Sequence, residues 1–119
     1  MDLQAMIQSI KSRPDFGKVG MILCHNGVVR QASRDGKPVT GLRVRVDHGK
    51  LNEIISRQKT KPGILEVLVD IKENTDLKVG DDVMFIVVAG DIRETVIETL
   101  TETLNRVKSE ATSKEQFFR

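Results

Sequence analysis

The run of apolar residues from Val83 to Ala89 limits the possible folds of this chain more than any other feature. The run is far too short to span a bilayer, which takes about 20 residues as a helix. It is also apolar at every position, whereas a strand with one face in water alternates between apolar and polar residues. We therefore expect Val83–Ala89 to be a central strand that is covered on both faces.

Apolar spacing predicts the remaining elements, in the order helix, strand, strand, helix, strand, strand, helix. Spacings of three and four residues predict helices at Leu3–Lys11, Lys50–Lys59 and Asp91–Lys108. Alternation predicts further strands at Lys18–Arg30, Val39–Val46 and Ile64–Lys72. This order is typical of an α+β fold with helices packed on a mainly antiparallel sheet. The length of 119 residues favours a single domain over residues 1–119.

The first predicted strand is interrupted at His25-Asn26-Gly27, where the glycine indicates a bulge or a close backbone approach. The last predicted helix opens on Asp91, which is a favourable N-cap, and Glu94 would complete an acidic capping box. Its buried stripe is predicted to contain Val96, Ile97, Leu100, Leu104 and Val107. Residues 109–119 show no periodicity, so we expect a flexible polar tail unless a partner holds it.

Composition argues against several classes of function. Nineteen Lys plus Arg against 17 Asp plus Glu give a net charge of +2, and the aromatic residues are four Phe with no Trp or Tyr, so no nucleic-acid role is expected. Cys24 is the only cysteine, and it has no metal-ligand spacing with His25 or His48, so we expect no disulfide and no metal site. No signal peptide or membrane span is visible, and a cytoplasmic protein is expected.

Cationic side chains are the best candidates for chemistry. Arg30 ends the stretch Gly27-Val28-Val29-Arg30, Arg93 lies in the first turn of the last helix, and Lys108 lies near its end. Together they predict a site for an anionic ligand. Plainer interpretations remain open, since lysine near a helix C-terminus complements the helix dipole and arginine on a surface is common. Arg93 has no acidic residue three or four positions further on that would pair with it within the helix.

Three stretches, in order, resemble the large, catalytic subunit of molybdopterin synthase, the MoaE family. The first is Gly27–Arg30, followed by a polar loop and a strand that opens on Pro38–Leu42. The second is Leu77-Lys78-Val79-Gly80-Asp81 with the apolar strand behind it, and the third is the final helix with Arg93 and Arg106-Val107-Lys108. The similarity runs from about Leu3 to about Gln116.

This resemblance implies an α/β hammerhead fold and a transferase. Such enzymes form a central homodimer and bind a small ubiquitin-like, MoaD-like sulfur-carrier subunit at each end. The carrier presents a C-terminal thiocarboxylate, and its sulfur passes to cyclic pyranopterin monophosphate to give the molybdopterin dithiolene. The large subunit is expected to need no cofactor for this reaction.

The resemblance also implies which residues bind the substrate. Arg30 matches the arginine of the family's strand-end motif, and Arg93 matches the arginine of a His-Arg pair. Their neighbours Val29 and Ile92 are expected at the same substrate-binding positions, with Ile92 standing where the family has histidine.

Two lysines are expected to be catalytic. Lys108 matches the lysine at the end of the family's long helix. Lys114 matches the lysine of its tail only if the alignment slips by one residue, since otherwise Glu115 falls there, and the tail tryptophan is missing. A catalytically impaired MoaE-like paralogue that binds carrier or pterin, and an unrelated small α+β metabolite-sensing module, remain alternatives.

Overall fold

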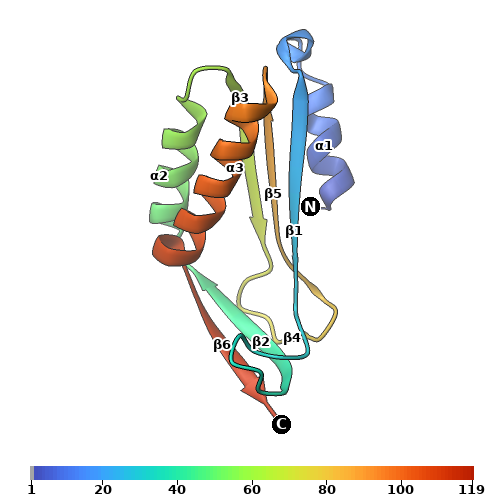
Figure 1. Cartoon of the computed structure of the whole chain (residues 1–119), viewed down its shortest axis with the longest axis vertical. Coiled ribbons are helices and arrows are strands. Elements are labelled where there is room, and N and C mark those ends of the chain that lie inside the picture. The colour runs from blue at the N-terminus through green and yellow to red at the C-terminus, as the bar shows by residue number, and fades with distance from the viewer. Residues whose placement is uncertain (1) are drawn as a thin grey trace.

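Two antiparallel three-stranded sheets lie end to end in this computed structural model, which describes residues 2–119 (Figure 1). The first sheet has the strand order β1 (Met21–Val28), β5 (Asp82–Gly90), β3 (Ile64–Ile71). The second has the order β4 (Leu77–Lys78), β2 (Val39–Val46), β6 (Thr112–Phe118). The helices are α1 (Leu3–Lys11), the 3-10 turn η1 (Phe16–Lys18), α2 (His48–Lys59), α3 (Arg93–Arg106) and the π-helical turn η2 (Val107–Ala111). The molecule is elongated, with extents of 49 × 25 × 23 Å.

Strand β5 is central, as the apolar run predicted. Residues Ile86 to Ala89 are completely buried, because β5 pairs with β1 on one side and β3 on the other. Alternate side chains enter two separate clusters. Phe85, Val87 and Ala89 pack with Met6 and Ile10 of α1. Met84, Ile86 and Val88 enter a larger core on the opposite face, which α2 and α3 cover and to which the second sheet also contributes.

The beginning of α3 differs from the prediction. Ile92 is the N-cap and makes no side-chain cap, while the Asp91 carboxylate accepts a 2.7 Å hydrogen bond from the Ile92 N–H. The capping box is therefore wrong, since the backbone bond from Asp91 N–H to Gly63 O (2.9 Å) ties Asp91 to the loop before β3. Glu94 instead pairs with the neighbouring Arg93, Nε to Oε1 at 3.2 Å, so Arg93 does have an acidic partner within the helix.

The buried face of α3 is also rotated from the predicted stripe. Ile97 is 47% exposed, whereas Thr99 and Thr103 are completely buried. Helix α2 supplies the reason, because its buried Gln58 offers a polar partner to this face of α3. The Thr103 hydroxyl, which is hydrogen-bonded to Gln58, can therefore occupy a helix–helix contact that an apolar pattern assigns to isoleucine.

The predicted polar tail is wrong, because the chain after η2 forms strand β6. This strand pairs with β2 from Thr112 opposite Val46 to Phe118 opposite Val39. The side chains of residues 113–115 are exposed, so the segment carries no apolar alternation from which a strand could be predicted. Backbone pairing with a long neighbouring strand, which sequence patterning does not show, holds the segment in place.

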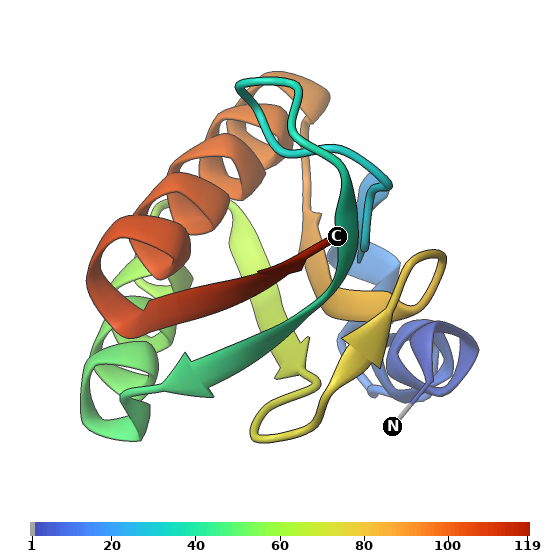
Figure 2. The ribbon, with the colours of Figure 1, turned by 90° about the horizontal axis from the view of Figure 1, so that it is seen from below.

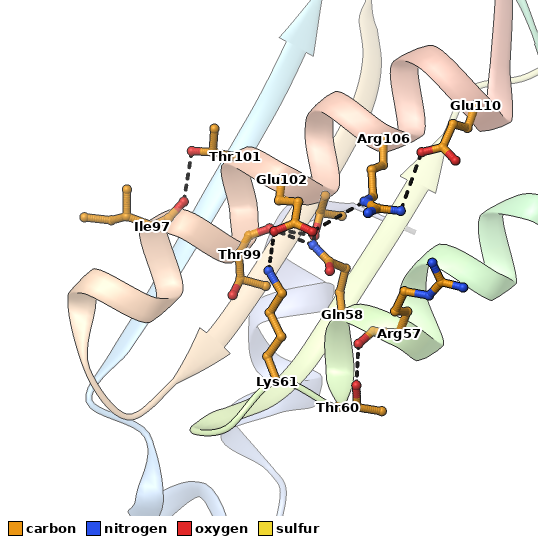
Figure 3. A network of polar contacts seen from close by, with 11 residues as sticks. Arg57, Gln58, Thr60, Lys61, Ile97, Thr99, Thr101, Glu102, Arg106 and Glu110 are labelled. Atoms are coloured by element: carbon orange, nitrogen blue, oxygen red, sulfur yellow. Dashed lines mark hydrogen bonds and ion pairs between the residues drawn. The ribbon is translucent and has the colours of Figure 1, made fainter.

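A polar network joins α2 to α3 (Figure 3). Gln58 Nε2 donates to Thr103 Oγ1 at 3.1 Å and to the Thr99 carbonyl at 3.4 Å, and Thr103 Oγ1 donates to the same carbonyl at 2.7 Å. Glu102, one position away and closer to solvent, pairs with both Lys61 and Arg106. By contrast, the Thr99 hydroxyl is buried and has no hydrogen-bond partner within residues 2–119.

The two buried threonines should therefore respond oppositely to the same substitution. Thr103→Val should lower the free energy of unfolding by roughly 1–3 kcal/mol, because Gln58 loses its closest acceptor in a buried site. Thr99→Val should be neutral or stabilising by up to about 1 kcal/mol, because it removes a hydroxyl that is desolvated without compensation. Urea denaturation of the two variants measures the difference, and equal losses of stability would contradict the network described here.

Candidate functional site

A cavity of about 610 Å³ lies where the two sheets meet. Its apolar wall comes from Leu42 and Val44 of β2 and from Val83 and Met84 of β5. Four cations also line it, and we call them the cationic cluster: Arg30, Arg34, Lys108 and Lys114. They come from the segment between β1 and β2, from η2 and from β6, which runs from η2 to the start of β2 (Figure 2).

Lys108 is placed by the π-helical turn that follows α3. Its neighbours Val107 and Ala111 are buried at 0% and 2% exposure and anchor the turn in the core. The Thr112 hydroxyl donates to the Val107 carbonyl at 3.2 Å, and Asp47 N–H donates to the Ala111 carbonyl at 2.8 Å. Single π-helical turns are frequent at functional sites. Here the turn leaves Lys108 exposed at the cavity wall.

Lys114 reaches the cavity through strand alternation. Thr112, Lys114 and Gln116 line the cavity, and Glu115, between them, does not. Successive side chains of a strand point to opposite faces. The lysine of β6, rather than the glutamate beside it, is therefore the residue placed next to Lys108.

Arg30 and Arg34 reach the cavity from the segment between β1 and β2. The bulge expected near Gly27 is confirmed, because the β1–β5 register shifts between Gly27 and Val28. Past the bulge, Val29 N–H donates to the Asp81 carbonyl and the Val29 carbonyl accepts from Gly80 N–H, both at 2.9 Å. These bonds fix the chain next to Arg30.

The cationic cluster is not neutralised by acids of the same chain. No Asp or Glu lines the cavity, and none of the four cations forms an ion pair within residues 2–119. Burial lowers the pKa of Lys114, and the positive charges of Lys108, Arg34 and Arg30 lower it further. A bound anion would relieve this repulsion, so the arrangement is typical of an anion-binding site.

His25 also lines the cavity, although no sequence pattern predicts this position for it. Its ring lies over Gly27, where an added Cβ would stand 3.2 Å from Nε2. Burial lowers the pKa of His25, and the nearby charge of Lys108 lowers it further. The imidazole is therefore neutral near pH 7 and lies close enough to Lys108 to sense its charge.

Replacing Lys108 by glutamine should raise the pKa of His25, because one cause of its low value disappears. The pKa should stay below the ordinary 6.5, because burial is the larger cause and is unchanged. NMR titration of the His25 ring proton measures this, with His48, which does not line the cavity, as the reference resonance. An unchanged His25 titration in the variant would show that the two groups do not interact.

Three of the expected site residues do not line the cavity. Val29 is 2% exposed and belongs to the hydrophobic core, with both its backbone groups in the bonds to Asp81 and Gly80. Ile92 is 55% exposed, and the Arg93 side chain is 77% exposed. Both lie at the start of α3, whereas Lys108 follows its end, which puts them roughly 20 Å away along a helix of 14 residues.

Other side chains give no second chemistry. No group of three or more His, Cys, Asp or Glu within residues 2–119 could hold a metal ion. Burial raises the pKa of the Cys24 thiol, which makes it a poor nucleophile. None of the helices in the described part of the chain has the length and apolarity that crossing a membrane requires.

Comparison with known proteins gives the fold a family. Solved structures similar to this chain include a molybdopterin synthase from Staphylococcus aureus (15% identity, TM-score 0.81, covering 100% of this chain and 86% of that one). A molybdopterin cofactor biosynthesis protein E from Burkholderia multivorans is 21% identical, with a TM-score of 0.78 and coverage of 100% and 82%. The third is a complex of subunits 1 and 2 of the molybdopterin-converting factor from Helicobacter pylori, 15% identical, with a TM-score of 0.72 and coverage of 99% and 84%.

These likenesses confirm the α+β, hammerhead-type fold. A search of curated proteins finds no match to the sequence. A family model described as "MoaE protein", however, matches residues 1–110. This chain therefore belongs to the MoaE family, which supports a role in molybdenum cofactor biosynthesis.

Proposed function

We propose that this chain is the catalytic large subunit of a molybdopterin synthase. It takes sulfur from the C-terminal thiocarboxylate of a small ubiquitin-like carrier and transfers it to cyclic pyranopterin monophosphate. The observation that carries the proposal is the cationic cluster: its four side chains line one cavity, and no acidic residue of the described chain, residues 2–119, lines that cavity with them. The chain that carries this cluster belongs to the MoaE family.

The charges of the reactants explain why such a cluster is needed. The substrate phosphate and the thiocarboxylate are both anions, and two unit charges about 4 Å apart repel by about 4 kcal/mol at an effective dielectric of about 20. Arg30 suits the phosphate, because a guanidinium can donate two parallel hydrogen bonds to it. The apolar wall of β2 and β5 suits the ring system of the pterin.

The two lysines suit the reacting centre. The Lys108 ammonium pairs with the thiocarboxylate and stabilises oxyanion character as water attacks the carrier's carbonyl carbon, so that the C–S bond breaks, the sulfur stays on the pterin and the carrier terminus becomes a carboxylate. Lys114 has a lowered pKa, so it gives up a proton more readily than an ordinary lysine. The proposal therefore assigns charge stabilisation to Lys108 and proton transfer to Lys114.

The proposed partner is a small MoaD-like carrier subunit. One similar structure is a complex between the two subunits of a molybdopterin-converting factor, which supports this assignment. The carrier's C-terminal segment would have to enter the cavity in an extended form, so that its terminal group lies beside the lysines.

A second copy of this chain is the proposed source of Arg93 and Ile92, because one protomer keeps both far from its own cavity. Ile92, the N-cap of α3, and Ile97, within the helix, are exposed apolar side chains that a homodimer could cover. Each site would then contain cations from both protomers.

Reconstitution tests the proposed function. The purified chain is mixed with thiocarboxylated carrier and cyclic pyranopterin monophosphate, and the carrier's loss of sulfur is followed by mass spectrometry together with dithiolene formation. Transfer that depends on this chain is the expected result. Carrier binding without transfer would instead identify a catalytically impaired paralogue, and no carrier binding would contradict the proposal altogether.

A further inference from the structure

We propose that Arg34 is a substrate-binding residue, which forms with Arg30 a two-guanidinium clamp for the phosphate within a single protomer. This inference rests on the proposed function for the identity of the phosphate ester. It gives Arg34, in the segment between β1 and β2, a ligand-binding role. Neither the sequence patterns nor the similarity to the family assigns this role to Arg34.

The segment that carries Arg34 is a tight turn built from its own residues. Ser33 N–H donates to the Lys37 carbonyl at 2.9 Å, Gly36 N–H donates to the Ser33 carbonyl at 3.0 Å, and Lys37 N–H donates to Ser33 Oγ at 3.1 Å. Gly36 has a φ of 85°, which favours glycine. These bonds hold the turn in one conformation, so little ordering is required when a ligand binds.

The base of the turn is attached to the second sheet. Ala32 and Pro38 form an isolated bridge, and Val39 N–H donates to the Gln31 carbonyl at 2.9 Å. The Ser33 side chain is 7% exposed, and its hydroxyl donates to Asp35. The turn therefore projects from a fixed support, which keeps Arg34 at the cavity wall.

Arg34 differs from the other charged residues of the turn in that it has no ion-pair partner within residues 2–119. Asp35 and Lys37 pair with each other, Oδ2 to Nζ at 3.7 Å. Arg34 makes no ion pair or hydrogen bond within residues 2–119, and it is the turn's charged residue that lines the cavity. An unpaired guanidinium on a fixed support is pre-organised to bind an anion, because no internal partner has to be displaced.

Phosphate is the anion that two guanidinium groups fit best. A phosphate monoester carries up to two negative charges and three terminal oxygens, and each arginine can donate two parallel hydrogen bonds to it. A thiocarboxylate has one charge and is matched by the ammonium groups of Lys108 and Lys114. The cavity thereby contains two arginines for one anion and two lysines for the other.

NMR titrations of the protein with inorganic phosphate and, separately, with acetate test the clamp without carrier or turnover. Acetate represents a singly charged carboxylate-type anion. Arg34→Gln should weaken phosphate binding about tenfold or more, which corresponds to the loss of a charged hydrogen-bond pair. Arg34→Lys should recover only part of the affinity, since an ammonium lacks the two-pronged geometry. Acetate binding should change less than phosphate binding.

Lys37→Gln is the matched control. It removes the same charge from the same turn, but from a side chain that pairs with Asp35 and does not line the cavity. Phosphate affinity should stay within about twofold of the unsubstituted protein, because a charge this exposed is largely screened. Equal weakening by both variants, or equal loss of acetate and phosphate, would overturn the clamp and leave only a general charge effect.

Steady-state kinetics separate this inference from the proposed function. In an active synthase, Arg34→Gln should raise KM for the pterin substrate more than it lowers kcat. If phosphate binding depends on Arg34 but the protein transfers no sulfur, the synthase assignment is refuted and the clamp is supported. Sulfur transfer with an unchanged KM in Arg34→Gln would refute the clamp and keep the assignment.

Discussion

Replacing Lys108 by alanine is expected to lower the rate of sulfur transfer about a hundred- to a thousandfold, the usual cost of removing one group that stabilises a developing oxyanion. The side chain is exposed at the cavity and makes no ion pair in the described chain, so its loss should leave the free energy of unfolding nearly unchanged. Single-turnover assays with thiocarboxylated carrier, together with urea denaturation of the same variant, measure both quantities.

Lys11→Ala is the matched control for Lys108. Lys11 also lies in the last turn of a helix, α1, where its charge complements the helix dipole, but it does not line the cavity. This control should retain full activity and lose at most a few tenths of a kcal/mol of stability. If the Lys108→Ala variant transferred sulfur at the same rate as the unsubstituted protein, Lys108, like Lys11, would only complement the dipole of a helix end.

Replacing Gly41 by alanine should lower the free energy of unfolding by roughly 2–3 kcal/mol or more. Gly41 lies in β2 between β4 and β6, opposite Lys78 and Phe117. A Cβ at this position would stand only 2.2 Å from the Leu77 carbonyl oxygen, and that oxygen belongs to a paired backbone that cannot rotate away. Because the strand would have to shift, the cavity wall at Leu42 should be disturbed as well.

Gly17→Ala provides the comparison for Gly41. An added Cβ at Gly17 meets no atom within 4 Å, so this variant should differ from the unsubstituted protein by less than about 0.5 kcal/mol. Urea denaturation of both variants gives the two values. Similar stability of Gly41→Ala and Gly17→Ala would show that β4 does not constrain β2 as described.

Much of the fold could be predicted from apolar periodicity, because packing determines those elements. The run Val83–Ala89 in β5 is apolar at every position because helices cover both faces of the strand, and α1 places Met6 and Ile10 against it at helical spacing. Strand β6 could not be found in this way. It is held by backbone bonds to β2, and backbone bonds leave no mark on side-chain pattern.

The candidate site could be predicted only in part for a related reason. Arg30, Lys108 and Lys114 were identified by resemblance to family motifs, and the structure places all three at one cavity. Arg34 and His25 have no motif, and only the folding of distant segments brings them to the same place. The choice between Lys114 and Glu115 also needed the strand, because alternation along β6 decides which side chain faces the cavity.

The cationic cluster has a thermodynamic cost for the protein itself. Folding gathers into one cavity four like charges that the unfolded chain keeps apart, and no acidic residue of the described chain, residues 2–119, lines that cavity. Ionic strength screens such repulsion, and an anion that binds only the folded form shifts the folding equilibrium by mass action. The repulsion that disfavours the folded form and the proposed binding of anions therefore have the same electrostatic origin.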